Sequence, residues 1–313
     1  MEPSIAVDPS PIAAEQQREL GSRRRRKSDA RAAAVFLAPA VIGFVIFYLV
    51  PIVRGFKMSL TDQNLLEEAK WVGFDNYVRL LEDETFINAV KVTVIYVVVN
   101  ITTQTVLGLL IAMLMMRVSQ STLIRSTLLL PWLIPNVTIA AITLFVLDPT
   151  VGLLNHLLSF IEVGPISFYG DSSIAIYTVA LVNSWRNMGY TGLLLFAGMQ
   201  TIPKMIYESA EVEGASTWQT FRLITVPLLR PILVMVVVVS MIGSFQIFDT
   251  VSVATSGGPG NSTRVIYLYI YEKAFQQFDM GYASAMAVVL MLALVILTLF
   301  QLKLARSSES DMD

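Results

Sequence analysis

Cysteine is absent from the 313 residues, and histidine occurs once, as His156. Without thiolates the chain can form neither disulfides nor a thiolate metal site, and one histidine in a polar loop makes no metal site by itself. Charge is also scarce, because charged residues make up 15% of the chain, hydrophobic residues 55%, and the mean hydropathy is +0.64. A soluble domain of this size is less apolar, so the composition predicts a chain embedded in lipid.

Nucleotide-binding motifs are missing as well. The sequence G-x-x-x-x-G-K-[ST] does not occur, and the Gly-rich run 257–263 has no lysine and follows no predicted strand. We expect that run to be an outer turn leading into residues 267–278. The apolar stretches also lack a cluster of histidines or acids for acid–base or metal chemistry, which argues against a membrane enzyme. Any ATP hydrolysis therefore has to be done by another polypeptide.

Six apolar stretches are long enough to cross a hydrocarbon core of about 30 Å, which takes about 20 helical residues. They are residues 32–53, 92–116, 126–147, 172–203, 231–248 and 280–302, and the fourth is interrupted only by Arg186. The pattern predicts an all-α polytopic membrane protein with six transmembrane helices. Six crossings place both termini on the same side of the membrane.

The distribution of basic residues predicts which side this is. Fourteen of the 22 Lys and Arg residues lie in the two tails and in the segments on the same side as them, seven lie in the opposite segments, and Arg186 lies within a span. Basic residues favour the cytoplasmic side. We therefore expect a cytoplasmic basic tail at 1–31, a permease domain at 32–305 and a cytoplasmic tail at 306–313. A cleaved signal peptide is the other interpretation, but the first apolar stretch is too long and lacks a clear cleavage site.

The longest polar insert on that side, residues 203–227, predicts two short helices. Pro203 suits a first helical turn, and Gly214 can adopt the left-handed conformation that ends a helix. Ser216 followed by Gln219 has the spacing of a capping box, so a second helix should begin there and run until Pro227 stops it. By these signals alone, an ordinary amphipathic loop remains an alternative.

The residue pattern of the insert resembles the cytoplasmic EAA loop of permease subunits in binding-protein-dependent ABC importers. The pattern is Glu208-x-Ala210-x-x-Glu213-Gly214-Ala215 followed by Phe221, Ile224, Pro227 and Pro231, with Ser209 and Glu213 where the family usually has Ala and Asp. The resemblance implies a coupling helix, between the fourth and fifth spans, that lies in a groove of the ATP-hydrolysing subunit. The implied coupling residues are Glu208, Ala210, Glu213, Gly214, Ala215 and Phe221.

Polar side chains at membrane depth are costly, so they should face a partner helix or a water-filled path. Asn183, Asn187 and Tyr190 follow one another at i, i+4 and i+7, on one face of the fourth span. Arg186 is adjacent to this face and needs a carboxylate, an acceptor-rich cavity or a route to the membrane surface. Hydrogen bonding between packed helices is the alternative for each of these residues.

The fifth and second spans carry further polar positions. Ser240, Gly243 and Ser244 share one face of the fifth span, where small residues either allow close packing or line a cavity. Asn100 and Gln104 are spaced at i and i+4 in the second span. We interpret these two as interhelical hydrogen-bonding residues rather than as ligand contacts.

Further motifs resemble the maltose-type carbohydrate permeases over roughly residues 30–305. They are Val182-Asn183-Ser184-Trp185, Ile202-Pro203 and Phe245-x-x-Phe248-Asp249 leading to Gly257-Gly258-Pro259. The resemblance implies a sugar bound near mid-membrane between the fourth and fifth spans. Asn183, Tyr190 and Ser240 match the family's contact pattern, whereas Asn187, Gly243 and Ser244 occupy contact positions with different side chains, so the identity of the sugar stays open.

The same resemblance implies the assembly. Its partners would be a second, homologous permease subunit, a dimer of ATP-binding subunits, an extracellular solute-binding protein and the surrounding lipid, without nucleic acid. The location would be a bacterial inner (plasma) membrane, crossed several times. This chain would bind no cofactor or metal, because ATP and Mg belong to the ATPase subunits.

Two alternatives involve Arg186. An arginine at this depth leaves open an importer of a phosphorylated polyol such as glycerol phosphate. A self-sufficient secondary transporter would use Arg186 and Asp249 as an ion-coupling pair, although six spans without a detectable inverted repeat disfavour this class.

Overall fold

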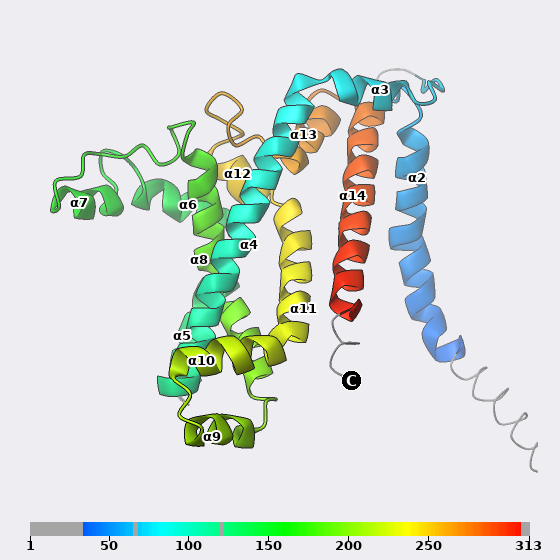
Figure 1. Cartoon of the computed structure of the whole chain (residues 1–313). Helices are drawn as coiled ribbons and strands as arrows, with labels where there is room; N and C mark the ends of the chain where they lie inside the picture. The colour runs from blue at the N-terminus through cyan, green and yellow to red at the C-terminus, as the bar shows by residue number, and fades with distance from the viewer. Residues whose placement is uncertain (1–33, 65–67, 119–121, 308–313) are drawn as a thin grey trace, which may run out of the picture. The chain divides into compact units, whose positions relative to one another are not determined.

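The computed structural model describes residues 34–64, 68–118 and 122–307, and in this part of the chain it is helical, with two isolated β-bridges and no strand. The all-α prediction is confirmed. The basic tail at 1–31 lies outside the described residues, as does most of the C-terminal tail. The chain divides into two units, residues 1–57 and 58–313, which are described separately (Figure 1).

The described part of the first unit is one apolar helix. It begins at Ala34, passes through a π-helical turn, η1 (Val45–Leu49), and continues as α2 (Val50–Met58). Its most hydrophobic stretch has no residue buried within the chain. A helix that is hydrophobic all round and uncovered by its own chain is suited to lipid or to a neighbouring subunit.

The second unit is built on four long helices: α4 (Glu84–Val118), α8 (Ala175–Met199), α11 (Val226–Phe245) and α14 (Met280–Ser307). Two glycines let α4 and α8 approach closely. A Cβ on Gly108 would collide with Thr191, and a Cβ on Gly192 would collide with Ile111. Small residues at such crossings are typical of helix packing in membranes, where close contact replaces hydrophobic burial as the attractive force.

By length and composition, four helical segments in the described residues could cross a membrane: Ala34–Met58, Glu84–Met116, Thr217–Ala254 and Met280–Lys303. The expected span at 126–147 is not one straight helix. It consists of α5 (Thr122–Leu133) and α6 (Asn136–Val146), which meet at an angle of 91°. The reason is Pro135, which has no N–H to donate and disfavours a helical conformation at Ile134.

Several short helices lie at the ends of the second unit. Figure 1 shows α3 (Asp75–Glu82) and α13 (Ile266–Tyr271) at one end of the long helices, and α9 (Lys204–Val212) and α10 (Thr217–Thr220) at the opposite end. The remaining elements are α7 (Leu153–Ser159), α12 (Asp249–Ala254), η2 (Phe221–Thr225) and η3 (Glu272–Gln276). The expected Gly-rich turn at 257–263 lies between α12 and α13, as predicted.

Asp83 links α4, α13 and α14 through hydrogen bonds at the α3 end of the unit. One carboxylate oxygen accepts hydrogen bonds from the backbone N–H groups of Thr85 and Phe86, at the start of α4. The other accepts from the Tyr269 hydroxyl at 2.6 Å and from the Tyr282 hydroxyl at 2.7 Å. Burial alone would raise the pKa of Asp83, but these four hydrogen bonds outweigh it and lower the pKa below its ordinary value of 3.8.

The end of α9 has the predicted glycine cap. Gly214 has φ +76°, in the left-handed region. Its N–H donates to Glu211 O at 3.0 Å, and the Ala215 N–H donates to Ala210 O at 2.9 Å. These two bonds form a Schellman motif, which satisfies carbonyl groups at the helix end.

The start of α10 has the predicted capping box, since Gln219 N donates to Ser216 Oγ and Ser216 N donates to Gln219 Oε1. The predicted stop at Pro227 is wrong, because the helix continues through η2 into α11. Val226 N–H donates to Phe221 O, across a π-helical turn. Pro227 follows directly after this π-helical turn, at the second residue of α11.

Candidate functional site

A polar cavity of about 420 Å³ lies among α4, α5, α8 and α11. All seven residues predicted to face a solute on the fourth and fifth spans line it: Asn183, Arg186, Asn187, Tyr190, Ser240, Gly243 and Ser244. The structure therefore brings residues some 50 positions apart in sequence to one place. The polar face of α8, predicted from its i, i+4, i+7 spacing, and the small-residue face of α11 both border this cavity.

The α8 wall combines amides with an aromatic pair. Asn183 is buried, and its Nδ2 lies 3.3 Å from Thr250 Oγ1. The Asn187 amide donates to the Asn183 carbonyl at 2.8 Å. One turn further on, the Tyr190 ring stacks on Trp132, with centroids 4.7 Å apart and planes 9° from parallel. The wall thus offers hydrogen-bonding groups beside a flat apolar surface.

The α4 and α11 walls are joined by buried amides. Gln104 Nε2 donates to Thr191 Oγ1 at 2.8 Å and to Ser240 Oγ at 3.1 Å. Asn100 Nδ2 donates to Ser244 Oγ at 2.9 Å. The interhelical role expected for Asn100 and Gln104 is confirmed. In these bonds both serines act as acceptors, so each hydroxyl keeps a hydrogen that can be donated into the cavity.

Gly243 opens onto the cavity, because a Cβ built there would have no heavy atom within 4 Å. A larger side chain at this position would occupy solute space without displacing protein atoms. Of the two expectations for the small residues of the fifth span, close packing or a cavity wall, the structure supports the second for Gly243.

Arg186 lies among hydrogen-bond acceptors, which is one of the environments expected for an arginine at membrane depth. Its Nε donates to Ile134 O at 3.1 Å and its Nη2 donates to Trp132 O at 3.0 Å. Both carbonyl groups belong to the corner between α5 and α6. Its third donor group, Nη1, lies 3.4 Å from Asn187 Oδ1.

Arg186 does not form the ion pair that a secondary transporter would need. Within the described ranges, the pairs closer than 4 Å are Arg79 with Asp279 and Arg264 with Glu272. Asp249 instead accepts a hydrogen bond from Asn136 Nδ2 at 3.1 Å. The structure therefore gives the ion-coupling pair no support, because Arg186 and Asp249 line the same cavity but form no salt bridge.

Trp132 and Asn136 line the cavity too, and sequence reasoning did not identify either as a site residue. A signal was present, since both flank the dipeptide Ile134-Pro135, which predicts a break. The expectation of one uninterrupted span at 126–147 did not include this break, at which Trp132 and Asn136 border the cavity.

The predicted coupling residues lie at the opposite end of α8 and α11 from α13. Ala210 is buried, Ala215 and Phe221 are half-buried, and Glu208, Glu213 and Gly214 are exposed. A second cavity of about 830 Å³ lies behind α9 and α10 and is lined by Met113, Met116, Met199, Tyr207, Trp218 and Phe221, among others. The two short helices thus expose both charged and large apolar side chains, among them Val212 and Trp218.

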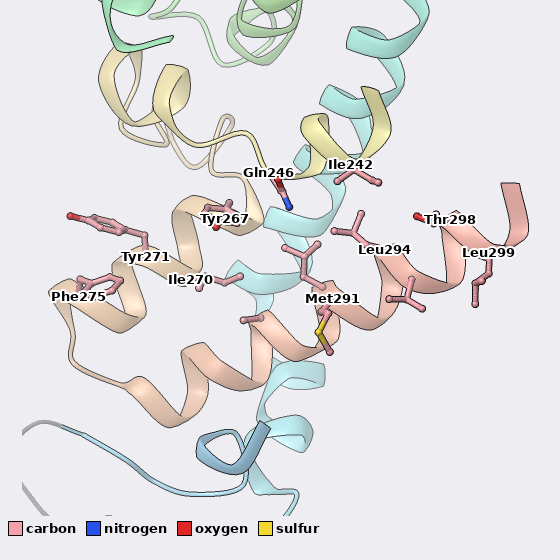
Figure 2. Close-up of a pocket in the computed structure, with 13 residues that line it drawn as sticks. Ile242, Gln246, Tyr267, Ile270, Tyr271, Phe275, Met291, Leu294, Thr298 and Leu299 are labelled. Atoms are coloured by element: carbon pink, nitrogen blue, oxygen red, sulfur yellow. The ribbon is translucent and has the colours of Figure 1, made fainter. Parts of the chain in front are cut away.

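A third hollow is an apolar groove of about 540 Å³ between α11, α13 and α14. Figure 2 shows Ile242, Met291 and Leu294 along it, with Gln246 at one side. Its lining is almost entirely hydrocarbon and aromatic, which leaves few hydrogen-bonding groups for a polar solute. The polar cavity is consequently the candidate solute site.

A polar cavity enclosed by long apolar helices is compatible with a membrane transport component. Residues 104–309 match the family described as "Binding-protein-dependent transport system inner membrane component". The chain belongs to this family, and the predicted resemblance to importer permeases is confirmed.

Curated relatives align along most of their length. The chain is 33% identical to "Probable ABC transporter permease protein YurN" of Bacillus subtilis (strain 168), over 88% of this chain and 97% of the relative. It is 30% identical to "Trehalose/maltose transport system permease protein MalF" of Thermococcus litoralis, over 89% and 95%. It is 31% identical to "Arabinooligosaccharides transport system permease protein AraP" of Bacillus subtilis (strain 168), over 97% of both chains.

Solved structures share the fold. A chain from a bacterial ABC transporter "involved in the import of the acidic polysaccharide alginate" superposes with a TM-score of 0.79 at 24% identity, covering 92% of this chain and 99% of that one. A second chain, from the alginate transporter in complex with an "alginate pentasaccharide-bound periplasmic protein", gives a TM-score of 0.78 at 24% identity, covering 91% and 96%.

Proposed function

We propose that this chain is one of two homologous permease subunits of an ATP-driven ABC importer that carries a sugar or oligosaccharide across a bacterial inner membrane. The observation that carries the proposal is the polar cavity between α8 and α11, which collects all seven predicted solute-facing residues. The names of two relatives, which mention trehalose, maltose and arabinooligosaccharides, support the solute class.

The chemistry of the cavity suits carbohydrate. Amides, serine hydroxyls and a phenol offer both donors and acceptors to sugar hydroxyls, and the stacked Trp132 and Tyr190 offer an aromatic surface. A volume of about 420 Å³ is within the range of about 300–1,000 Å³ found for small-molecule sites. The proposed solute contacts are Asn183, Asn187, Tyr190, Ser240, Gly243 and Ser244. No observation favours a phosphorylated polyol, because Nε and Nη2 of Arg186 donate to backbone carbonyl groups and its Nη1 lies beside Asn187 Oδ1.

The proposed topology has six crossings. Five of them are the helix ending at Met58, α4, α11, α14 and the broken pair α5–α6 counted as one span. The sixth is α8, which does not meet the same test of length and composition and is placed in the membrane by the proposal. Both termini, α9 and α10 would lie in the cytoplasm, and α3, α13 and the Gly-rich turn at 257–263 would lie outside. The turn and its neighbours would form part of the surface on which an extracellular solute-binding protein docks.

The α9–α10 corner is the proposed contact with a dimer of ATPase subunits, which would hold ATP and Mg. Glu208 is exposed on α9 and is proposed as an anchoring contact, with Glu213 beside it. The glycine cap and the capping box fix the corner, and η2 joins α10 to α11 without a flexible break. A rigid connection of this kind can transmit a rigid-body motion.

The proposed cycle is alternating access. ATP binding would close the ATPase dimer and bring the coupling helices of the two permease subunits together. Because α10 is continuous with α11, this motion would turn the spans so that the cavity opens outward to receive solute. Hydrolysis would return it to face the cytoplasm.

Filling the cavity tests the proposal. Gly243→Val places a branched side chain in the cavity where no protein atom lies within 4 Å of the new Cβ. Since one methylene in a binding pocket changes discrimination by about tenfold or more, we expect solute uptake by membrane vesicles to fall at least that far with normal abundance of the chain. Gly43→Val is the matched control, because Gly43 also has open space around it and lies in a helix outside the cavity. Equal uptake by the two variants would contradict the proposal.

A further inference from the structure

The corner between α5 and α6 leaves backbone carbonyl groups without helical partners. An α-helix ends with four carbonyls that have no intrahelical N–H, and at this corner Pro135 cannot supply one. Two nearby carbonyls find backbone partners, since Ile134 N donates to Pro131 O at 3.4 Å and Ile139 N donates to Pro135 O at 3.1 Å. The carbonyls of Trp132 and Ile134 lie between these and need donors from elsewhere.

Arg186 of α8 supplies both donors. Its Nη2 reaches Trp132 O at 3.0 Å, and its Nε reaches Ile134 O at 3.1 Å. The planar guanidinium holds these N–H groups at a fixed spacing, which suits two acceptors two residues apart. Non-helical backbone within a membrane is tolerated where it is paired inside the protein or lines a polar cavity, and Arg186 gives both carbonyls a partner at the edge of such a cavity.

Trp132 thus contacts α8 in two ways. Its carbonyl accepts from Arg186, and its ring stacks on Tyr190, four residues further along the same helix. Residues at i and i+4 lie on one helical face, one turn apart. The position of the aromatic wall of the cavity therefore depends on the hydrogen bond made by Arg186.

We propose that Arg186 is a positioning residue: it fastens the broken span α5–α6 to α8 and so sets the Trp132–Tyr190 wall of the cavity, without binding the solute through its charge. The inference depends on the proposed function for the role of the cavity. It also distinguishes arginine from lysine, because a single ammonium group cannot reproduce the planar two-donor geometry.

The test uses the complete importer, assembled with its partner subunits in lipid nanodiscs without solute. Arg186→Lys and Arg186→Gln are compared with the unaltered chain by hydrogen exchange of the peptide covering residues 131–142. Arg79→Gln is the matched control, since it removes an arginine that pairs with Asp279 outside the cavity. We expect both Arg186 variants to exchange about tenfold faster in this peptide, and the control to leave it unchanged.

A second measurement separates positioning from general damage. Uptake of radiolabelled maltotriose is measured for Trp132→Ala, for Arg186→Lys and for the double variant. Trp132→Ala keeps the backbone carbonyl that Arg186 binds, so it should fold. Each single variant should raise the half-saturating concentration about tenfold, with a maximal ATP-hydrolysis rate within about twofold of normal, and the double variant should be little worse than either.

Two results would overturn the inference: exchange of the 131–142 peptide at the normal rate in Arg186→Lys, or uptake defects that multiply in the double variant. The hydrogen-exchange measurement tests the inference even if a variant takes up no solute. If the unaltered importer takes up no maltotriose or other sugar, the proposed function fails separately, and the exchange result still shows whether Arg186 holds the corner.

Discussion

Gly214 allows the mechanical role of the α9–α10 corner to be tested by backbone strain alone. Its φ is +76°, a region that disfavours residues with a Cβ, and a Cβ built there would have no heavy atom within 4 Å. A substitution therefore brings no collision, only the cost of the left-handed conformation. That cost is about 1–2 kcal/mol for most L-residues and is smaller for asparagine. It would weaken the bond from the residue 214 N–H to Glu211 O and the bond from Ala215 N to Ala210 O.

The substitutions Gly214→Asn, Gly214→Ala and Gly214→Val introduce increasing backbone strain, in that order. If the corner must be rigid to couple ATP hydrolysis to the spans, 1–2 kcal/mol translates into a corner about five to thirty times less often in its working geometry. We expect ATP-driven uptake by membrane vesicles to be nearly normal for Asn, reduced for Ala and lowest for Val. Abundance in the membrane should be unchanged, because the position is exposed.

The assay is uptake per copy of the chain, with ATP hydrolysis measured in the same vesicles. Uncoupling would appear as lost uptake with ATP hydrolysis that no longer responds to the binding protein. The reasoning is refuted if Val transports as well as Gly, or if Asn and Val lose uptake equally, since then φ at this position does not matter.

Two further predictions concern stability. Asp83 has a lowered pKa in the folded chain, so its hydrogen bonds add stability that is complete above the ordinary value of 3.8 and is lost as pH falls through the folded value. We expect the thermal midpoint of the purified complex to fall more steeply below about pH 4 than that of Asp83→Asn, and parallel curves would contradict the assignment. Gly189→Ala would drive a Cβ into the carbonyl oxygen of Leu128, where α5 crosses α8. We expect a loss of about 1–3 kcal/mol, seen as a lower thermal midpoint, whereas Gly43→Ala, which has open space, should have little effect.

The sequence allowed the local features to be predicted because their causes lie within a few residues. The hydrogen bonds of the Gly214 cap and of the Ser216–Gln219 capping box join residues that are close in sequence. The end of α9 and the start of α10 therefore lie where they were expected. The polar faces of α8 and α11 could likewise be read from spacing, since the helical repeat fixes which residues share a face. Pro227 was misread because tolerance of a proline depends on the π-helical turn before it, which its local sequence does not reveal.

By itself, then, the sequence determined the helical membrane class, the end of α9, the start of α10 and the residues on each polar face, since all of these follow from composition and short-range patterns. Only the tertiary structure decided that the 126–147 stretch turns by 91°, that Trp132 stacks on Tyr190, and that Arg186 donates to backbone rather than pairing with Asp249. The physical reason is that a carbonyl group freed at a helix break takes whichever donor the packing brings within reach. That donor lies on another helix, more than 50 residues away along the chain.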